Sequence, residues 1–263
     1  MAETVLTEVD SGIGIITLNR PERHNAFDEE LIAQLADALQ DMEADPEVRV
    51  VVLSSTGRSF CAGADLTWMQ RAAEYSEDEN YQDAVALAGM LRILNELNKP
   101  TIARVQGPAY GGGVGLVAAC DIAVATFDAH FSLSEVRLGL IPAVISPYVI
   151  AAVGSRRARR YMLTGERFSA SEAYRIGLLH EIVPGEEELD DAVGELVEAL
   201  LAGGPHAQGE CKELIRLVAD RQIDEDVIEA TAQRISRVRA SEEGREGVAA
   251  FLEKRKPAWT HED

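Results

Sequence analysis

The sequence predicts an α/β fold in which parallel strands alternate with helices, and three observations carry this prediction. Apolar runs of strand length recur at residues 48–53, 101–105 and 121–125. Residues 81–97 carry apolar residues at helical spacing, and a further helix is expected at residues 112–119, after the second glycine-bearing loop. At two places a glycine-bearing loop joins a strand-like run to the next helix. Repetition of strand, loop and helix in this order favours parallel pairing.

The first part of the chain contains an expected hairpin and an expected helix. Residues 4–9 and 12–18 alternate partly between apolar and polar positions and flank a short turn-forming segment, which predicts a β-hairpin. Asp28 stands where a helix N-cap is expected, because apolar residues recur at helical spacing directly after it. These residues are Leu31, Ile32, Leu35, Ala38 and Leu39.

The later elements carry clear end signals. Pro100 ends the long helix before the strand at 101–105. Residues 171–176 predict a short helix that ends at a glycine, and a strand at 182–183 follows. After the glycine pair at 203–204 the pattern is purely helical.

Length and composition are those of one large domain, or of one domain with a small appendage. The chain has 263 residues, of which 46% are hydrophobic and 5% aromatic, so we expect an aliphatic core. No apolar run reaches membrane-spanning length, and the first residues lack the basic and apolar regions of a signal peptide. Cys61, Cys120 and Cys211 form no disulfide or metal pattern, and the five histidines show no metal-ligand spacing. We therefore expect a cytoplasmic protein without a membrane segment or a metal.

The two glycine-bearing loops, at residues 59–66 and 107–115, are the most informative feature of the chain. Small residues allow a ligand to approach the backbone closely. The start of a helix leaves N–H groups unpaired and carries partial positive charge. Two such loops that face each other could each give one N–H to a single oxygen that becomes negative during a reaction. This pattern predicts an oxyanion hole and chemistry through an enolate or a related intermediate.

Several motifs, in order along nearly the whole chain, resemble the crotonase superfamily, the enoyl-CoA hydratase/isomerase family. The matching segments are Leu18-Asn19-Arg20-Pro21 with Asn25-Ala26, Phe60-Cys61-Ala62-Gly63-Ala64-Asp65-Leu66, residues 107–113, Ala119-Cys120-Asp121-Ile122, residues 134–142, and residues 244–247 with 251–257. The resemblance implies a crotonase-like spiral of repeated ββα units, at residues 1–203. It implies a helical trimerisation region at residues 204–263, and hence a homotrimer or a dimer of trimers.

The resemblance also implies an acyl-CoA site without a separate cofactor, since coenzyme A is part of the substrate. By motif position the catalytic groups are Glu135 and the backbone N–H groups of Ala64 and Gly112. Glu135 lies among apolar neighbours, and burial would raise its pKa toward the range of a general acid or base. The substrate-binding positions are Arg23, Ala26, Ala62, Asp65, Leu66, Gly115, Pro142 and Lys254. Asp65 is better interpreted as a helix N-cap than as a catalytic acid.

One departure from the family pattern concerns the mechanism. Members that hydrate enoyl-CoA commonly carry a second glutamate two residues after the triple glycine, and this chain has Gly115 there. We expect Gly115 to leave space that suits a branched or carboxylated acyl group. Residues 141–148 also replace the glycine-rich run that is usual after this proline, and both features are similar to bacterial hydratases of the methylglutaconyl-CoA type.

Three mechanisms remain open at this point. Glu135 alone could position water and move a proton, it could move a proton between two carbons as an isomerase does, or the acyl group could supply its own carboxylate. We rank the hydratase first and the isomerase second, and a non-catalytic acyl-CoA binder is the alternative from another class.

The net charge of −20 argues against nucleic acid as a partner. Because an acyl-CoA is itself anionic, local basic groups must hold it. The candidates are Arg23, the arginines at 156–160, and the basic segment 254–256. Each of these, taken singly, is also compatible with an ordinary solvated surface charge.

Overall fold

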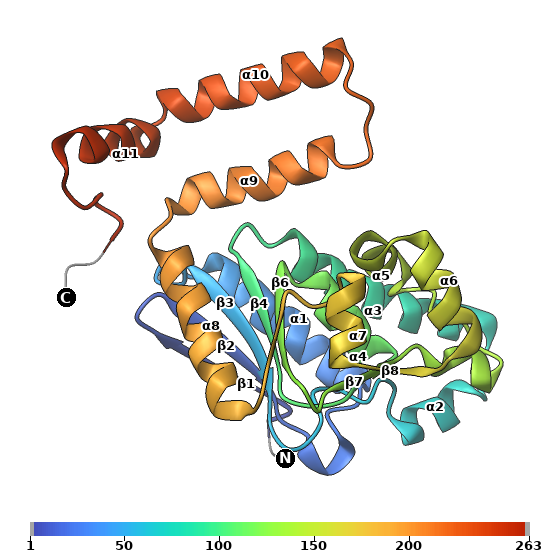
Figure 1. Cartoon of the computed structure of the whole chain (residues 1–263). Coiled ribbons are helices and arrows are strands. Elements are labelled where there is room, and N and C mark those ends of the chain that lie inside the picture. The colour runs from blue at the N-terminus through green and yellow to red at the C-terminus, as the bar shows by residue number, and fades with distance from the viewer. Residues whose placement is uncertain (1–2, 261–263) are drawn as a thin grey trace.

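A computed structural model of the protein describes residues 3–260 and contains two sheets (Figure 1). The strands are β1 (Val5–Asp10), β2 (Ile13–Leu18), β3 (Val50–Ser55), β4 (Thr101–Val105), β5 (Ala109–Tyr110), β6 (Ile122–Thr126), β7 (His130–Ser132), β8 (Arg167–Ser169) and β9 (Glu181–Val183). The larger sheet has the order β1-β2-β3-β4-β6-β9, and the smaller one has the order β5-β7-β8. Only β1 runs antiparallel in the larger sheet, where it forms the expected hairpin with β2. The predicted hairpin and the predicted parallel core are both confirmed.

Helices cover both faces of the larger sheet and also form a separate tail. They are α1 (Glu29–Ala44), α2 (Leu66–Ala72), α3 (Glu77–Glu96), α4 (Gly112–Ala119), α5 (Ser146–Val153), α6 (Ser155–Thr164), α7 (Ala170–Ile176), α8 (Glu186–Leu201), α9 (Pro205–Val218), α10 (Glu225–Ala240) and α11 (Glu242–Glu253). Two short 3-10 helices are η1 (Pro21–Arg23) and η2 (Ser134–Leu138). None of the described helices is both long and apolar enough to span a bilayer.

Strand β3 shows why a central strand contains a continuous apolar run, here residues 50–53. All of its six residues are buried. Val51 and Leu53 belong to the core shared with α1, α3 and α4, whereas Val50 and Val52 pack on the opposite face with α8. A strand that is covered on both faces needs apolar residues at every position rather than at alternate ones.

Helix starts follow the expected capping rules. The Asp28 side chain accepts a hydrogen bond from Leu31 N and caps α1, as predicted. The short helix predicted near 171 is α7, and it ends at Gly177 in the left-handed conformation (φ +92°).

The tail consists of α9, α10 and α11, and Figure 1 shows α10 and α11 projecting away from the sheets. Lys212 of α9 ties the tail to the core, because its Nζ donates to Asp121 Oδ2 at 2.6 Å. Farther along, Arg49 donates to the backbone oxygens of Trp259 and Gly203. Several large apolar side chains of the tail are exposed, namely Ile215, Ile223, Ile228, Ile235, Val248, Phe251 and Leu252. The trimer and the division of the chain at residue 203 stay predictions.

Candidate active site

The first glycine-bearing loop is fixed to the segment that precedes α1. Phe27 N donates to Gly63 O at 2.7 Å, and Asp65 N donates to Phe27 O at 2.8 Å. The buried Asn25 supports this arrangement, because its Nδ2 donates to the backbone oxygens of Thr56 and Ser59. The loop is therefore held on both sides before α2 begins.

The two glycine-bearing loops touch each other. Tyr110 N of the second loop donates to Cys61 O of the first at 2.9 Å. A Cβ atom on Gly63 would lie 2.9 Å from Tyr110 O, and a Cβ atom on Gly113 would overlap Cys61 O. Glycine is required at both positions because the two backbones approach this closely. The prediction that the loops face each other is confirmed.

Each loop offers one free backbone donor. Within residues 3–260, neither Ala64 N nor Gly112 N donates a hydrogen bond to a protein acceptor. Gly112 is the first residue of α4, where N–H groups point away from the helix and the helix dipole is positive. Ala64 is exposed and Gly112 is half-buried, so an oxygen atom of a ligand can reach them.

The smaller sheet brings Glu135 to the second loop. Strand β7 pairs with β5, and Gly111 N donates to Ser132 O at 2.9 Å. Since η2 begins two residues later, its Glu135 side chain lies across Gly111. A Cβ atom on Gly111 would lie 2.9 Å from Glu135 Oε1. The absence of a side chain at 111 therefore makes room for this carboxylate next to the N-terminus of α4.

The environment of Glu135 suits a group that exchanges protons. Its Oε2 atom is buried and has no hydrogen-bond partner among the described residues. Burial raises the pKa of the Glu135 carboxyl above its ordinary value, because the charged form loses contact with water. A raised pKa beside two free N–H donors is typical of an acid–base site.

The comparisons with known proteins agree with this geometry. The family model described as enoyl-CoA hydratase/isomerase matches residues 8–262. An enoyl-CoA hydratase of Alternaria alternata is 36% identical and aligns with 90% of this chain and 77% of its own length. The chain belongs to the enoyl-CoA hydratase/isomerase family.

Two further relatives span nearly the whole chain. The 1,2-epoxyphenylacetyl-CoA isomerase of Escherichia coli is 35% identical, with 99% of each chain covered. The crystal structure of an enoyl-CoA hydratase from Shewanella pealeana has a TM-score of 0.95 at 42% identity and covers 97% of this chain and 96% of its own. The expected crotonase fold is thereby confirmed. Hydration or isomerisation of enoyl-CoA is the activity at the level of this family.

Five of the predicted substrate-binding residues gather around the first loop. They are Arg23, Ala26, Ala62, Asp65 and Leu66. Ala62 N donates to His24 O at 2.9 Å, and the charge of Arg23 acts on Asp65. Leu66 is 74% exposed at the start of α2.

Asp65 caps α2, as predicted, and accepts hydrogen bonds from Thr67 N and Trp68 N. Burial opposes its charged form, but these N–H groups and the nearby Arg20 lower the pKa of Asp65 below its ordinary value. Arg20 also pairs with Asp28 at 2.8 Å and with Asp65 at 3.5 Å, so it links the caps of α1 and α2. The sequence showed Arg20 only as part of a motif, since its two partners lie 8 and 45 positions away.

Lys254 lies apart from the other predicted site residues. It ends α11 in the left-handed conformation (φ +58°) and is exposed. Figure 1 shows α11 far from α2 and α4, so one chain does not bring Lys254 to the two loops. Pro142 is buried in the segment between η2 and α5.

The prediction of open space beside Gly115 is wrong. A Cβ atom on Gly115 would overlap Ile145 Cγ2 and would lie 2.9 Å from Ile145 Cβ. Ile145 is 3% exposed and directly precedes α5. Gly115 is thus a packing glycine between α4 and α5.

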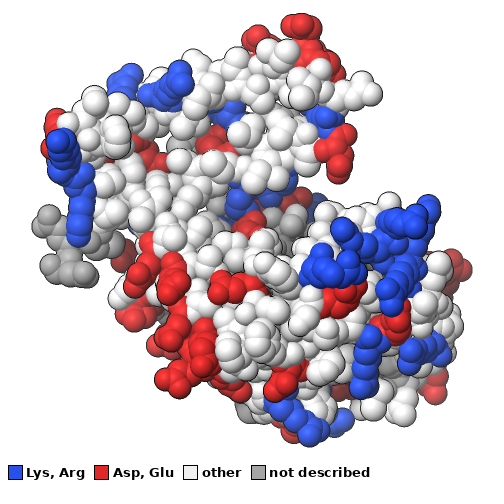
Figure 2. All heavy atoms as spheres, in the orientation of Figure 1, with Lys and Arg blue, Asp and Glu red and all other residues white. Residues whose placement is uncertain are grey.

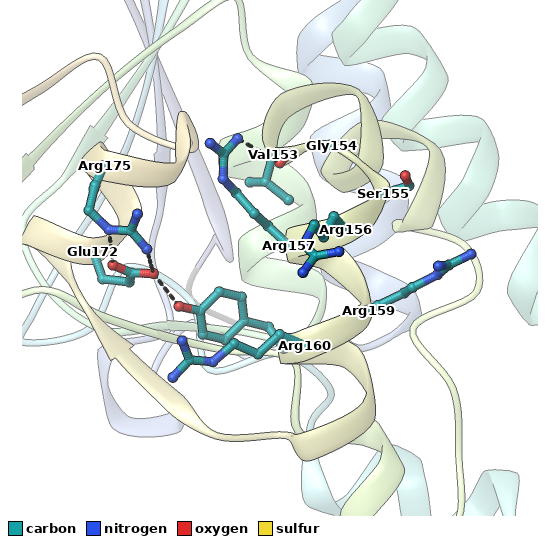
Figure 3. A pocket seen from close by; sticks show the side chains of 10 residues that line it. Val153, Gly154, Ser155, Arg156, Arg157, Arg159, Arg160, Glu172 and Arg175 are labelled. Carbon is teal, nitrogen blue, oxygen red and sulfur yellow. Dashed lines mark hydrogen bonds and ion pairs between the residues drawn. The ribbon is translucent and has the colours of Figure 1, made fainter.

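The arginines of α6 form a separate basic pocket of about 920 Å³ (Figure 3). Figure 2 shows Lys and Arg side chains gathered where Figure 1 draws α5 and α6. Two of the lining arginines are paired, Arg160 with Glu166 and Arg175 with Glu172. The residues that line this pocket include neither Glu135 nor any residue of the two loops. This pocket is therefore distinct from the candidate active site, although α6 packs against η2, which carries Glu135.

Proposed function

We propose that this protein adds water across the double bond of a 2-enoyl-CoA thioester, with Glu135 as the single acid–base group. The observation that carries the proposal is the half-buried Glu135 carboxylate beside Gly111, next to the free N–H of Gly112. Its Oε2 atom is buried and has no hydrogen-bond partner within residues 3–260. In this family that combination supports chemistry at the carbons next to a thioester.

Each group has a definite task in the proposed reaction. The thioester oxygen accepts hydrogen bonds from Ala64 N and Gly112 N. The Glu135 carboxylate takes a proton from water while the water oxygen bonds to C3 of the acyl group. The electron pair of the C2–C3 double bond moves onto C2 and the thioester, and the oxyanion is stabilised by the two donors. Glu135 then returns the proton to C2, which completes a syn addition.

A second candidate function is the shift of the double bond by the same base. The apolar Ile145 beside Gly115 favours it, because a second carboxylate that could hold water is missing there. In this case Glu135 would move a proton between C2 and C4, and no water would add. The Escherichia coli relative shows that the family includes isomerases.

Binding of the coenzyme A part requires cations, and Arg23, whose charge acts on Asp65, is the candidate at the first loop. Lys254 can act on a bound acyl-CoA only from another copy of the chain, since α11 lies far from α2 and α4. The exposed apolar residues of the tail support self-association as a homotrimer or a dimer of trimers.

A panel of acyl-CoA substrates tests the proposal. We expect loss of the conjugated absorbance of 2-enoyl-CoA substrates and formation of 3-hydroxyacyl-CoA, identified by mass spectrometry. A 3-enoyl-CoA is the control for double-bond migration. Migration of that double bond without hydration of any 2-enoyl-CoA would replace the hydratase with the isomerase. Binding of acyl-CoA without either reaction would show a non-catalytic binder.

A further inference from the structure

One contact joins the two places where this sequence departs from relatives with two glutamates. The first place is Gly115, where such relatives carry the second glutamate. The second is residues 141–148, which replace a glycine-rich run. In the structure Ile145 of this segment fills the position of the missing Gly115 side chain. The two departures are therefore coupled: α4 loses a side chain at Gly115, and Ile145, which directly precedes α5, fills the space.

The exchange lies one helical turn from the Glu135 carboxylate. Gly115 N donates to Gly111 O at 3.2 Å, so the two glycines are one turn apart on a similar face of α4. Four residues of helix correspond to about 6 Å along the axis. Glu135 lies against Gly111 and Ile145 lies against Gly115. Ile145 thus stands where a second carboxylate would project from α4 toward the same site.

The surroundings of this position are aliphatic. Leu91 Cδ1 lies 3.8 Å from the place of a Gly115 Cβ atom, and both Leu91 and Ile145 are buried. A carboxylate placed there without a partner would be strongly disfavoured. Neither Ile145 nor Leu91 offers a charged group that could hold a water molecule, so we assign that task to Glu135.

We propose that Ile145 is a specificity-determining residue, which takes the place of the second carboxylate and leaves this side of the acyl site without a charged group. This inference rests on the proposed function. An apolar substituent at C3, such as a methyl group, would meet no carboxylate on this side and would displace no water bound to one. In a site with two carboxylates the same methyl group would remove water from a charged group. We therefore expect 3-methylcrotonyl-CoA to be preferred over crotonyl-CoA.

The test is a double-mutant cycle with Gly115→Glu, Ile145→Gly and the combined variant. Gly115→Glu alone should lower the melting temperature by roughly 5 °C or more, because the new side chain collides with Ile145. Adding Ile145→Gly should restore most of this loss. Val144→Gly is the matched control, since the neighbouring residue loses its side chain without making room at Gly115. Gly115→Ala replaces Gly115→Glu in the cycle if the latter does not fold alone.

The activity measurement is the ratio of kcat/KM for 3-methylcrotonyl-CoA to that for crotonyl-CoA. We expect this ratio to fall at least about 10-fold from the wild type to the combined variant, a change of about 1.4 kcal/mol. A folded combined variant with an unchanged ratio would overturn the specificity role. The assigned exchange would be overturned if Val144→Gly restored the melting temperature of Gly115→Glu as well as Ile145→Gly does, or if Ile145→Gly did not restore it. If the wild type hydrates other 2-enoyl-CoA substrates but neither of these two, the specificity role fails and the proposed function stands. If it hydrates no 2-enoyl-CoA, the proposed function fails, while the melting cycle still decides whether Ile145 fills the place of the missing side chain.

Discussion

Two successive turns of α4 carry glycines for different reasons. At the first turn, Gly111 makes room for the Glu135 carboxylate and Gly112 exposes a free N–H. At the second turn, Gly115 is covered by the aliphatic Ile145. The first turn is thus open to polar chemistry, and the second is sealed by packing. The role of each glycine thus depends on which group occupies the position of its absent side chain.

The largest expected effect is that of Glu135→Gln, which removes the acid–base group that we assign to the open turn. The amide keeps the size of the side chain but cannot transfer the proton, so kcat should fall about 10²–10⁴-fold. Binding of a non-reactive acyl-CoA, measured by calorimetry, should be retained. A variant that keeps more than about a tenth of the wild-type kcat would show that another base acts.

The next effect in size concerns the N–H of Gly112. Proline at this first helical position removes the donor, and proline is tolerated there in many helices. Loss of one oxyanion donor is worth roughly 3–4 kcal/mol, or about 10²–10³-fold in kcat. Gly112→Ala is the matched control, because its Cβ atom meets the Phe27 ring at the same 2.5 Å but the N–H remains.

The ratio of the two Gly112 variants isolates the donor from the steric change. Both proteins must first show cooperative melting. Equal kcat values for the folded alanine and proline variants would refute the oxyanion role of Gly112.

A smaller effect is expected at Gly111. Gly111→Ala places a Cβ atom 2.9 Å from Glu135 Oε1 and should displace the carboxylate, with a roughly 10–10²-fold loss of kcat/KM. Gly139→Ala is the control, since Gly139 also has a positive φ (+75°) but no atom within 4 Å of its Cβ position. Gly139→Ala should cost about 1–2 kcal/mol in the free energy of unfolding, because Gly139 is in the left-handed region. Gly111→Ala should cost more, since its φ of +49° and ψ of −117° lie outside that region. Similar activity losses in the two variants would mean that backbone strain, rather than contact with Glu135, explains the effect.

Long periodic elements could be predicted from the sequence, whereas the short elements that assemble the site could not. The hairpin, α1 and β3 lie close to where periodicity and capping place them, because their patterns extend over several residues. Strands β5 and β7 have two and three residues, too few to show a period, yet their pairing brings Glu135 to Gly111.

The site shows the same division. The motifs identified Glu135 and the two loops, and the structure brings them together. The contact between Gly115 and Ile145 joins residues 30 positions apart, and no local pattern in a single sequence reveals such a contact. The side chain that fills a glycine's empty position is set by tertiary packing, which explains why the predicted space at Gly115 was wrong.

The smallest expected effect is a pH dependence of the melting temperature that arises from the raised pKa of Glu135. Burial raises the pKa of Glu135 in the folded protein, so the folded state binds this proton more tightly than the unfolded state does. The contribution of Glu135 to stability is therefore fully present below its unfolded pKa, and it is lost as the pH rises through the folded pKa. At neutral pH the ionised carboxylate opposes folding, and Glu135→Gln should melt at a higher temperature than the wild type. The difference should shrink as the pH falls toward 4, where the wild-type carboxyl is protonated as well.

Hydration, in contrast, requires the ionised form, so kcat/KM should decrease as the pH falls through the raised pKa. Melting curves and kcat/KM, measured across the same pH series, test the expected direction of both pH dependences. A Glu135→Gln variant that melts below the wild type at neutral pH would show that the carboxylate has a stabilising partner, which would contradict an unpartnered base at this turn of α4.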